Sequence, residues 1–209
     1  MKTVYFVRHG QVESNVKKLH QGPDDPLTEL GRKQSEFIAR RVANLPVDAL
    51  IASPYVRTKE TAKIIAQTIG VEPEYSELFV ENRVPSRFVG VPEDSPEAQE
   101  AFAIIRSNYG PGFRFEDEES YDEHALRATA ALSLLSERPE EHILVVTHGT
   151  FLKTLLAHVV FDMSPSPKEI RRVITHLQTT NTGITICTHG ADRMVPWMLE
   201  VFNDHAHLG

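Results

Sequence analysis

Three His-Gly pairs, each after a short apolar run, are the first candidates for chemistry: His9 in "VYFVRHG", His148 in "ILVVTHG" and His189 in "ITICTHG". The reference pKa of histidine is about 6.5, so an imidazole can act as a base or as a nucleophile near neutral pH. Arg8 stands directly before His9, and Arg57 follows another apolar run in "SPYVRTKET". Guanidinium groups and helix N-termini bind phosphoryl oxygens. In a chain of net charge -7, the two arginines therefore predict a local anion pocket.

The apolar pattern predicts the elements that must position these residues. Short apolar runs indicate buried strands, and the longer segments between them indicate helices. We expect strands at Val4–Val7, Val47–Ser53, Tyr75–Val80 and in "HILVVT", and helices at about 30–42, 54–70, 97–107, 123–137 and 150–160. This alternation predicts an α/β fold, a three-layer α/β/α sandwich with a mostly parallel central sheet. Such sheets bind ligands beyond the carboxyl ends of their strands, where Arg8, His9 and His148 are expected to lie.

The last two apolar runs, "ITIC" and "WMLEVF", are too close in sequence for a helix to join them. They predict an antiparallel edge hairpin near the C-terminus. His189 is followed by "GADR", which is typical of a turn, whereas His148 is followed by a predicted helix. We therefore expect His189 to be an exposed loop residue without a chemical role.

The composition bounds the class of protein. The chain has 209 residues, of which 41% are hydrophobic and 24% charged, so we expect one domain over residues 1–209. A Pro-rich and charged segment at about 82–122 is expected to cover the pocket. The negative net charge argues against bulk-charge binding of nucleic acid or of anionic membranes. The apolar runs are too short to span a bilayer, so we expect a cytoplasmic location.

Four motifs occur in an order that covers most of the chain: "VRHGQVESN" (Val7–Asn15), "QGPDDPLTELGRKQ" (Gln21–Gln34), "SPYVRTKETA" (Ser53–Ala62) and "VVTHG" (Val145–Gly149). Together they resemble the histidine phosphatase superfamily, whose members have the phosphoglycerate-mutase-like fold. A lone "RHG" would be weak evidence, but four ordered motifs are specific.

The resemblance implies a role for each matching residue. His9 is implied to be the nucleophile that carries a phosphohistidine intermediate, and Arg8, Arg57 and His148 are implied to line the phosphate pocket. The remaining implied ligands of the substrate are Asn15, Gln21 and Gly22. Neither a metal nor a cofactor is required by this scheme. A covalent intermediate divides one difficult displacement into two easier ones.

The general acid is the role with two candidates. The family places a glutamate after the third strand, and "FVE" puts Glu81 at that position, with Glu77 as the nearby alternative. Either carboxyl could instead be a solvated loop residue. The "E…G.WEG" pattern of many broad phosphatases is replaced here by "ENRVPSRFVG", so the specificity of that subset is not carried over.

Three functions are compatible with these residues. The first is a phosphomonoester hydrolase acting on a small phosphorylated metabolite. The second is a mutase of the phosphoglycerate type, which would return the phosphoryl group to another hydroxyl. The third is a non-catalytic phosphate-binding module, which would lack the nucleophile or the acid. Mutases of this family carry longer insertions before the late histidine, and this chain is short there, which favours the hydrolase. Arg83, Arg87 and Arg106 are either a second anion site or surface charges.

Overall fold

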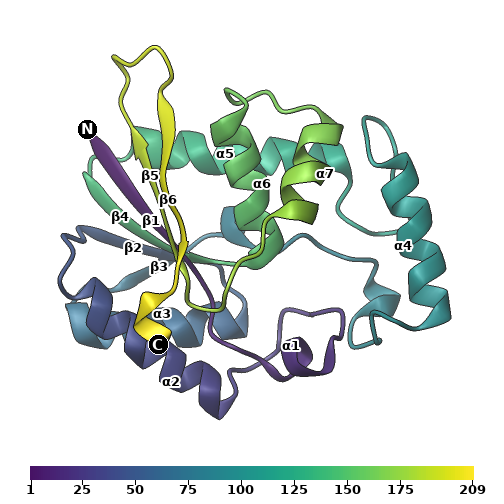
Figure 1. Ribbon diagram of the computed structural model, residues 1–209, viewed down its shortest axis with the longest axis horizontal. Coiled ribbons are helices and arrows are strands. Elements are labelled where there is room, and N and C mark those ends of the chain that lie inside the picture. Colours follow the sequence, from purple (N-terminus) through teal and green to yellow (C-terminus); the bar gives the residue numbers. More distant parts are fainter.

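The computed structural model describes all residues from 1 to 209, and its centre is a six-stranded sheet in the order β3-β2-β4-β1-β5-β6. The strands are β1 (Lys2–Arg8), β2 (Ala49–Ala52), β3 (Pro73–Tyr75), β4 (His142–Thr147), β5 (Ile184–His189) and β6 (Trp197–Asp204). The first four strands of that order are parallel, while β5 is antiparallel to β1 and β6 is antiparallel to β5. The predicted parallel sheet with an antiparallel edge hairpin is therefore confirmed (Figure 1).

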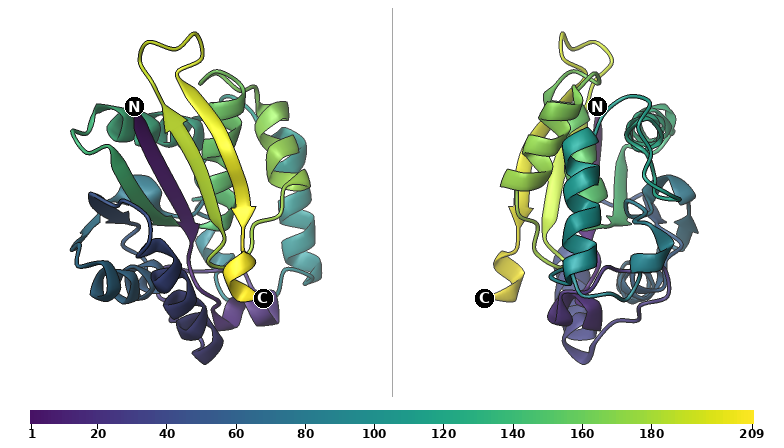
Figure 2. Two further views of the ribbon diagram at one scale, coloured as in Figure 1. Left: turned by 60° about the vertical axis from the view of Figure 1, so that its left-hand side comes forward. Right: turned by 90° about the vertical axis from the view of Figure 1, so that its right-hand side faces the viewer.

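Helices cover both faces of this sheet (Figure 2). They are α1 (Glu13–Lys17), α2 (Glu29–Val42), α3 (Val56–Ile69), α4 (Pro96–Asn108), α5 (Tyr121–Glu137), α6 (Gly149–Val160) and α7 (Pro167–His176). Apolar residues of α2 and α3 pack on one face, and those of α5 and α6 pack on the other. The three-layer sandwich is thus confirmed. None of the helices combines the length and the apolar character that a membrane crossing requires.

Strand β1 shows why the sheet is buried on both sides. Val4 and Phe6 belong to the core under α5 and α6, and Tyr5 and Val7 belong to the core under α2 and α3. Successive side chains of a strand point to opposite faces, so a strand covered on both sides is an unbroken apolar run. Each fully buried side chain of this kind contributes roughly 1.5–3 kcal/mol. The central position of β1 fixes the place where His9 emerges from the sheet.

The third predicted strand is largely wrong. We expected a strand over Tyr75–Val80, but β3 spans only Pro73–Tyr75 and a 3₁₀ helix, η1, follows at Glu77–Phe79. The hydroxyl of Ser76 accepts a hydrogen bond from the backbone N–H two residues later, which turns the chain out of the extended conformation. As a result Glu81 lies on a loop beyond η1 and not at the end of a strand.

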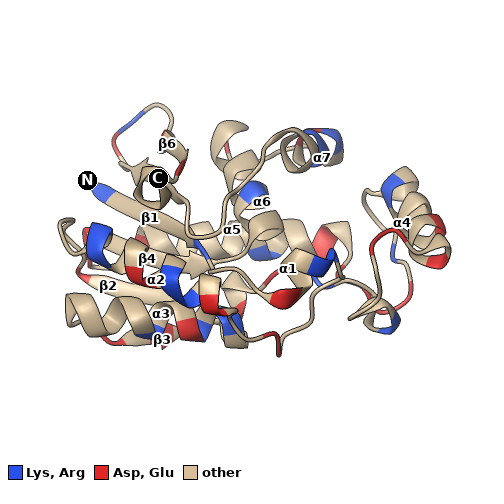
Figure 3. Cartoon of the chain, turned by 60° about the horizontal axis from the view of Figure 1, so that its bottom comes forward, with Lys and Arg blue, Asp and Glu red and all other residues tan.

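The segment between η1 and α5 stands away from the sheet and carries a second 3₁₀ helix, η2 (Ser86–Phe88), and α4 (Figures 1 and 3). Its two ends meet, because the backbone N–H of Glu119 donates to the carbonyl of Arg83 over 2.9 Å. Within it, Arg87 pairs with Glu97 and Glu116. The guanidinium of Arg87 is therefore occupied by carboxylates of the same segment.

Candidate active site

The carboxyl ends of three neighbouring strands bring the predicted residues together. Strand β4 lies between β1 and β2, so His9 after β1, Ser53 after β2 and His148 after β4 emerge side by side. The ring centroids of His9 and His148 are 5.2 Å apart. From the first turn of α3, the Nε of Arg57 reaches to 3.2 Å from the Nε2 of His9. These residues, far apart in sequence, form one cluster.

The hydrogen bonds of His9 define its tautomer. Its Nδ1 lies 2.7 Å from the carbonyl oxygen of Gly10, which can only accept, so Nδ1 carries the proton. Its Nε2 accepts from the Nε–H of Arg57 and therefore presents a lone pair. The side chain is buried, and this burial, followed by the charges of Arg57 and Arg8, holds the pKa of His9 well below 6.5. The imidazole is thus a neutral base whose lone pair is on Nε2, where it accepts from Arg57.

Three buried nitrogens of this cluster have no partner within the protein: Arg8 Nε, Arg57 Nη2 and His148 Nδ1. Leaving a buried polar group unpaired costs about 1–3 kcal/mol, and more when the group is charged. Each guanidinium is nevertheless fixed by a main-chain carbonyl, Arg8 Nη1 by that of Thr179 over 2.5 Å and Arg57 Nη1 by that of Gly22 over 2.6 Å. Fixed, unpaired donors gathered in one cluster are suited to the oxygens of an anion.

His148 is oriented by Ser53. The Ser53 hydroxyl accepts from the backbone N–H of Tyr55 over 3.3 Å and lies 2.8 Å from His148 Nε2. We assign the hydroxyl proton to Nε2, the arrangement that leaves the imidazole proton on the unpaired Nδ1. Burial, and then the charge of Arg57, holds the pKa of His148 well below 6.5. In this tautomer His148 is a neutral donor whose Nδ1–H has no partner within the protein.

Glu81 is held at the N-terminus of α6. Its Oε1 accepts from the backbone N–H groups of Asn82, at 2.9 Å, and Phe151, at 2.8 Å, and its Oε2 accepts from that of Thr150, at 3.0 Å. Helix N-termini favour negative side chains. Glu81 lines a cavity of about 550 Å³ together with Arg8, whereas the side chain of Glu77 is exposed at the start of η1. Of the two candidate carboxyls, Glu81 is the one beside the arginines.

The three residues expected to bind substrate have different environments. Asn15 and Gln21 line the same cavity as Arg8. The Oδ1 of Asn15 already accepts from Val12 N and from the Nδ2 of Asn181, which leaves its own Nδ2 as the available donor. Gly22 contributes the carbonyl that holds Arg57. Gly22 thus acts on the arginine through its main chain.

Sequence reasoning missed three residues that support the cluster. Ser53 orients His148, the carbonyl of Thr179 holds Arg8, and the Nδ2 of Asn181 donates to the backbone carbonyl of His9 over 2.9 Å. Ser53 stands inside the "SPYVR" motif, so its position was available as a signal. Thr179 acts through its main chain, and its side-chain type therefore carries no signal.

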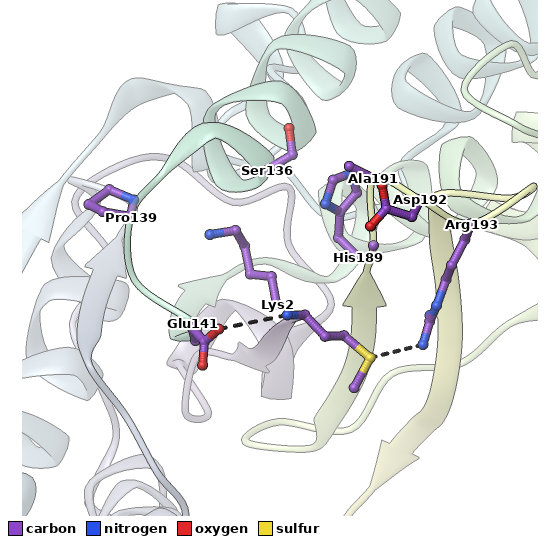
Figure 4. A pocket seen from close by; sticks show the side chains of 10 residues that line it. Lys2, Ser136, Pro139, Glu141, His189, Ala191, Asp192 and Arg193 are labelled. Carbon is purple, nitrogen blue, oxygen red and sulfur yellow. Dashed lines mark hydrogen bonds and ion pairs between the residues drawn. The ribbon is translucent and has the colours of Figure 1, made fainter.

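His189 differs from the expectation. It is the last residue of β5 and is partly buried, with its ring 4.8 Å from that of Trp197, because strand pairing continues to the end of the "ITICTH" run. The predicted turn begins one residue later. His189 pairs with Lys2, at the end of β1 opposite to His9, and lines a separate pocket with Arg193 and Asp192 (Figure 4). It is distant from the His9 cluster, as predicted.

Comparison with known proteins places this arrangement in a family. Residues 4–204 match the family model of the histidine phosphatase superfamily, branch 1. A protein of Photorhabdus laumondii subsp. laumondii named "Probable phosphoglycerate mutase GpmB" is 32% identical over 215 residues, covering 100% of this chain and 95% of the relative. A protein of Yersinia pestis with the same name is 34% identical over 217 residues, with the same shares covered.

Solved structures agree in fold. Bacillus stearothermophilus YhfR superposes with a TM-score of 0.83 at 26% identity and covers 100% of both chains. Phosphoserine phosphatase from Entamoeba histolytica, in complex with 3-phosphoglyceric acid, has a TM-score of 0.81 at 24% identity with the same coverage. The four ordered motifs, the mixed sheet and the match over residues 4–204 lead to one conclusion. The chain belongs to the histidine phosphatase superfamily, branch 1.

Proposed function

We propose that this chain is a phosphomonoester hydrolase in which His9 accepts the phosphoryl group on Nε2. The observation that carries the proposal is the neutral, buried imidazole of His9, whose Nε2 lone pair lies among unpaired donors of Arg8, Arg57 and His148. Phosphoryl transfer depends mainly on positioning and on stabilising the charge of the equatorial oxygens. A nucleophile inside a ring of fixed donors meets both needs.

The first step forms a bond between His9 Nε2 and phosphorus and breaks the bond from phosphorus to the leaving oxygen. The step starts from the protonated carboxyl of Glu81, which gives its proton to that oxygen, so the product leaves as an alcohol. The guanidinium groups and the Nδ1–H of His148 stabilise the phosphoryl oxygens. The ring of His9 gains positive character, which its Nδ1–H shares with the Gly10 carbonyl at 2.7 Å.

The second step uses water as the acceptor. Glu81, now ionised, takes a proton from water while the oxygen attacks phosphorus and the bond to His9 Nε2 breaks. Inorganic phosphate is released, and both His9 and Glu81 return to their starting states. The Oε2 of Glu81 has a single backbone partner, whereas Oε1 has two, so Oε2 is the oxygen with room for the transferred proton.

The substrate is proposed to be a small phosphorylated metabolite. The cavity beside Arg8 and Glu81 holds about 550 Å³, which is within the range of small-molecule sites. Ile174 and Leu177 are its apolar lining residues, and the others are polar or glycine. A polar leaving group, such as a hydroxy acid or a sugar, suits this lining better than an acyl chain.

Mutase activity is the second candidate, because relatives 32% and 34% identical carry the name of a probable phosphoglycerate mutase. A mutase shares the first step but returns the phosphoryl group from His9 to another hydroxyl of the substrate. The two functions therefore differ only in the acceptor of the second step.

One experiment separates the candidates. The protein is incubated with 3-phosphoglycerate, phosphoserine and glycerol phosphate, while phosphate release is measured by colorimetry and 2-phosphoglycerate by ³¹P NMR. The proposal expects phosphate release; isomerisation without release would establish the mutase, and neither reaction on a wider metabolite panel would favour a binding module. Alkaline trapping should yield an acid-labile phosphohistidine in the wild type and in His189→Ala, and none in His9→Ala.

A further inference from the structure

Arg127 of α5 is a buried arginine behind the candidate active site. Its side chain is 10% exposed. The Nη1 of Arg127 donates to the main-chain carbonyls of Leu78, at 3.1 Å, and Val80, at 2.8 Å. Val80 directly precedes Glu81. One guanidinium nitrogen therefore fixes the last turn of backbone before the proposed general acid.

The same guanidinium also touches the other side of Glu81. Its carbon lies 4.0 Å from the ring centroid of Phe151, a contact that combines packing with cation–π attraction. The backbone N–H of Phe151 donates to Glu81 Oε1 over 2.8 Å. Arg127 is thus in contact with the backbone that leads to Glu81 and also with Phe151, a residue that binds the carboxylate of Glu81.

Glu119 fixes Arg127 in turn. Two parallel hydrogen bonds of 2.6 Å join Nε and Nη2 of Arg127 to the two carboxylate oxygens of Glu119, whose side chain is 1% exposed. Burial opposes ionisation of Glu119, but its hydrogen bonds and ion pair with Arg127 hold its pKa below the usual value. Such a bidentate pair has one geometry only. The guanidinium cannot rotate while the pair is intact.

We infer that Arg127, locked by Glu119, is a positioning residue for Glu81. The inference rests on the proposed role of Glu81 as general acid. A general acid must lie within hydrogen-bond reach of the leaving oxygen, about 2.6–3.2 Å, and Glu81 stands on a loop that provides no regular structure to hold it there. Backbone N–H groups hold the carboxylate of Glu81, and Arg127 adds a constraint on the backbone that carries it. Lysine could not replace Arg127, because an ammonium group lacks the planar fork that reaches three groups at once.

A purely structural role is the alternative. Glu119 also joins the two ends of the segment between η1 and α5, since its carboxylate accepts from the backbone N–H of Arg83 over 3.4 Å. If Arg127 merely kept this junction folded, its loss would lower activity toward every substrate alike. Positioning of an acid has a different consequence, because only poor leaving groups need a proton. An alkoxide needs it, and a nitrophenolate does not.

The test is a comparison of kcat/KM for glycerol phosphate and p-nitrophenyl phosphate in the wild type, Glu81→Gln, Arg127→Lys and Arg127→Met. General acid catalysis contributes about 10²–10⁴-fold, so Glu81→Gln should lose at least about 100-fold on glycerol phosphate and far less on p-nitrophenyl phosphate. Arg127→Lys should shift the ratio in the same direction by at least about 10-fold. The matched control is Arg114→Met, which breaks the ion pair of Arg114 with Glu123. Its ratio should equal that of the wild type.

The double variant Glu81→Gln/Arg127→Lys completes the cycle. If Arg127 acts through Glu81, its replacement should not change the substrate ratio further once Glu81 is gone. Equal losses of kcat/KM on both substrates in Arg127→Lys would overturn the inference. It would also be overturned if Arg127→Lys shifted the substrate ratio as much in the Glu81→Gln background as in the wild type. An unselective loss in Glu81→Gln would instead show that the proposed acid is wrong. Should Arg127→Met not fold, Arg127→Lys and the double variant still decide.

Discussion

The Nε of Arg57 donates to the Nε2 of His9 over 3.2 Å, so the arginine binds the lone pair with which the histidine is proposed to attack. This contact has two effects. Together with burial, the larger cause, the cation keeps the pKa of His9 low and the imidazole neutral. It also places the guanidinium at the point where a phosphoryl group would be bound. When substrate arrives, the Nε–H must turn from nitrogen to a phosphoryl oxygen, which frees the lone pair.

Replacing Arg57 by lysine should therefore remove more than a charge. An ammonium group retains the positive charge but cannot reach the Gly22 carbonyl and His9 together. Loss of one preorganised donor typically costs about 10²–10³-fold in rate, so we expect kcat/KM of Arg57→Lys to fall by that amount. Steady-state phosphate release measures the effect, with the exposed Arg40→Lys as control. A kcat/KM of Arg57→Lys that lies within about threefold of the wild-type value would contradict the contact assigned between Arg57 and His9.

Much of the candidate site was predictable because strand ends are encoded simply. The unbroken apolar runs of β1 and β4 are typical of strands buried on both faces, and in a parallel sheet their carboxyl ends share one edge. His9 and His148 follow from that rule. Arg57 follows in the same way, because it comes after the next apolar run and the first turn of α3 carries it to the same edge.

Other parts depend on contacts that the sequence pattern does not carry. The carboxylate of Glu81 is held beside the arginines by backbone N–H groups of α6, which lie about seventy residues away in sequence. The short strand β3 ends at a side-chain to backbone bond of Ser76 that outweighs the strand preference of the following residues. His189 joins a strand because its neighbours are Lys2 and Trp197 on adjacent strands. Long-range pairing of this kind is not visible in a local window.

Ser53→Ala should affect His148 without touching the nucleophile. The variant removes the donor to His148 Nε2, so the proton is no longer confined to Nδ1. A neutral hydrogen bond is worth about 0.5–1.5 kcal/mol, which corresponds to a fall in kcat/KM of about two- to tenfold. Added phosphate should also raise the Tm of Ser53→Ala less than it raises that of the wild type. Ser107→Ala on the exposed face of α4 is the matched control, and equal behaviour of the two variants would argue against the tautomer assigned to His148.

The stability of the protein should decrease as the pH falls below 6.5. Burial lowers the pKa of His124 to about 4, while in the unfolded chain it is near 6.5. Between these values the unfolded state binds more protons, so the free energy of unfolding falls as the pH decreases and the contribution of His124 levels off below about 4. One such group changes the slope by at most about 1.4 kcal/mol per pH unit. The buried His9 and His148 act with the same sign.

Urea unfolding at a series of pH values measures this slope. The variant His124→Asn should show a shallower decrease than the wild type over the interval from 6.5 to 4. The exposed His205→Asn, placed far from α5, serves as the control. An unchanged slope in His124→Asn would mean that His124 gains a proton in the folded protein as readily as in the unfolded one.

Gly31→Ala should destabilise the protein even though it improves the helix propensity of α2. Alanine is favoured over glycine inside helices by about 1 kcal/mol. At this position, however, an added Cβ would lie 2.1 Å from the carbonyl oxygen of Gln11, a main-chain atom that cannot move aside independently. The same close approach places the carbonyl of Gly31 against Gly10, whose own carbonyl holds the Nδ1–H of His9. Chemical denaturation should therefore show a loss of stability, and phosphate release should fall because the histidine is displaced.

Glu36→Ala, at an exposed position of the same helix, should stay within about 0.5 kcal/mol of the wild type. A Gly31→Ala variant as stable as that control would show that the loop after His9 can retreat from α2, and that the helix does not fix the nucleophile.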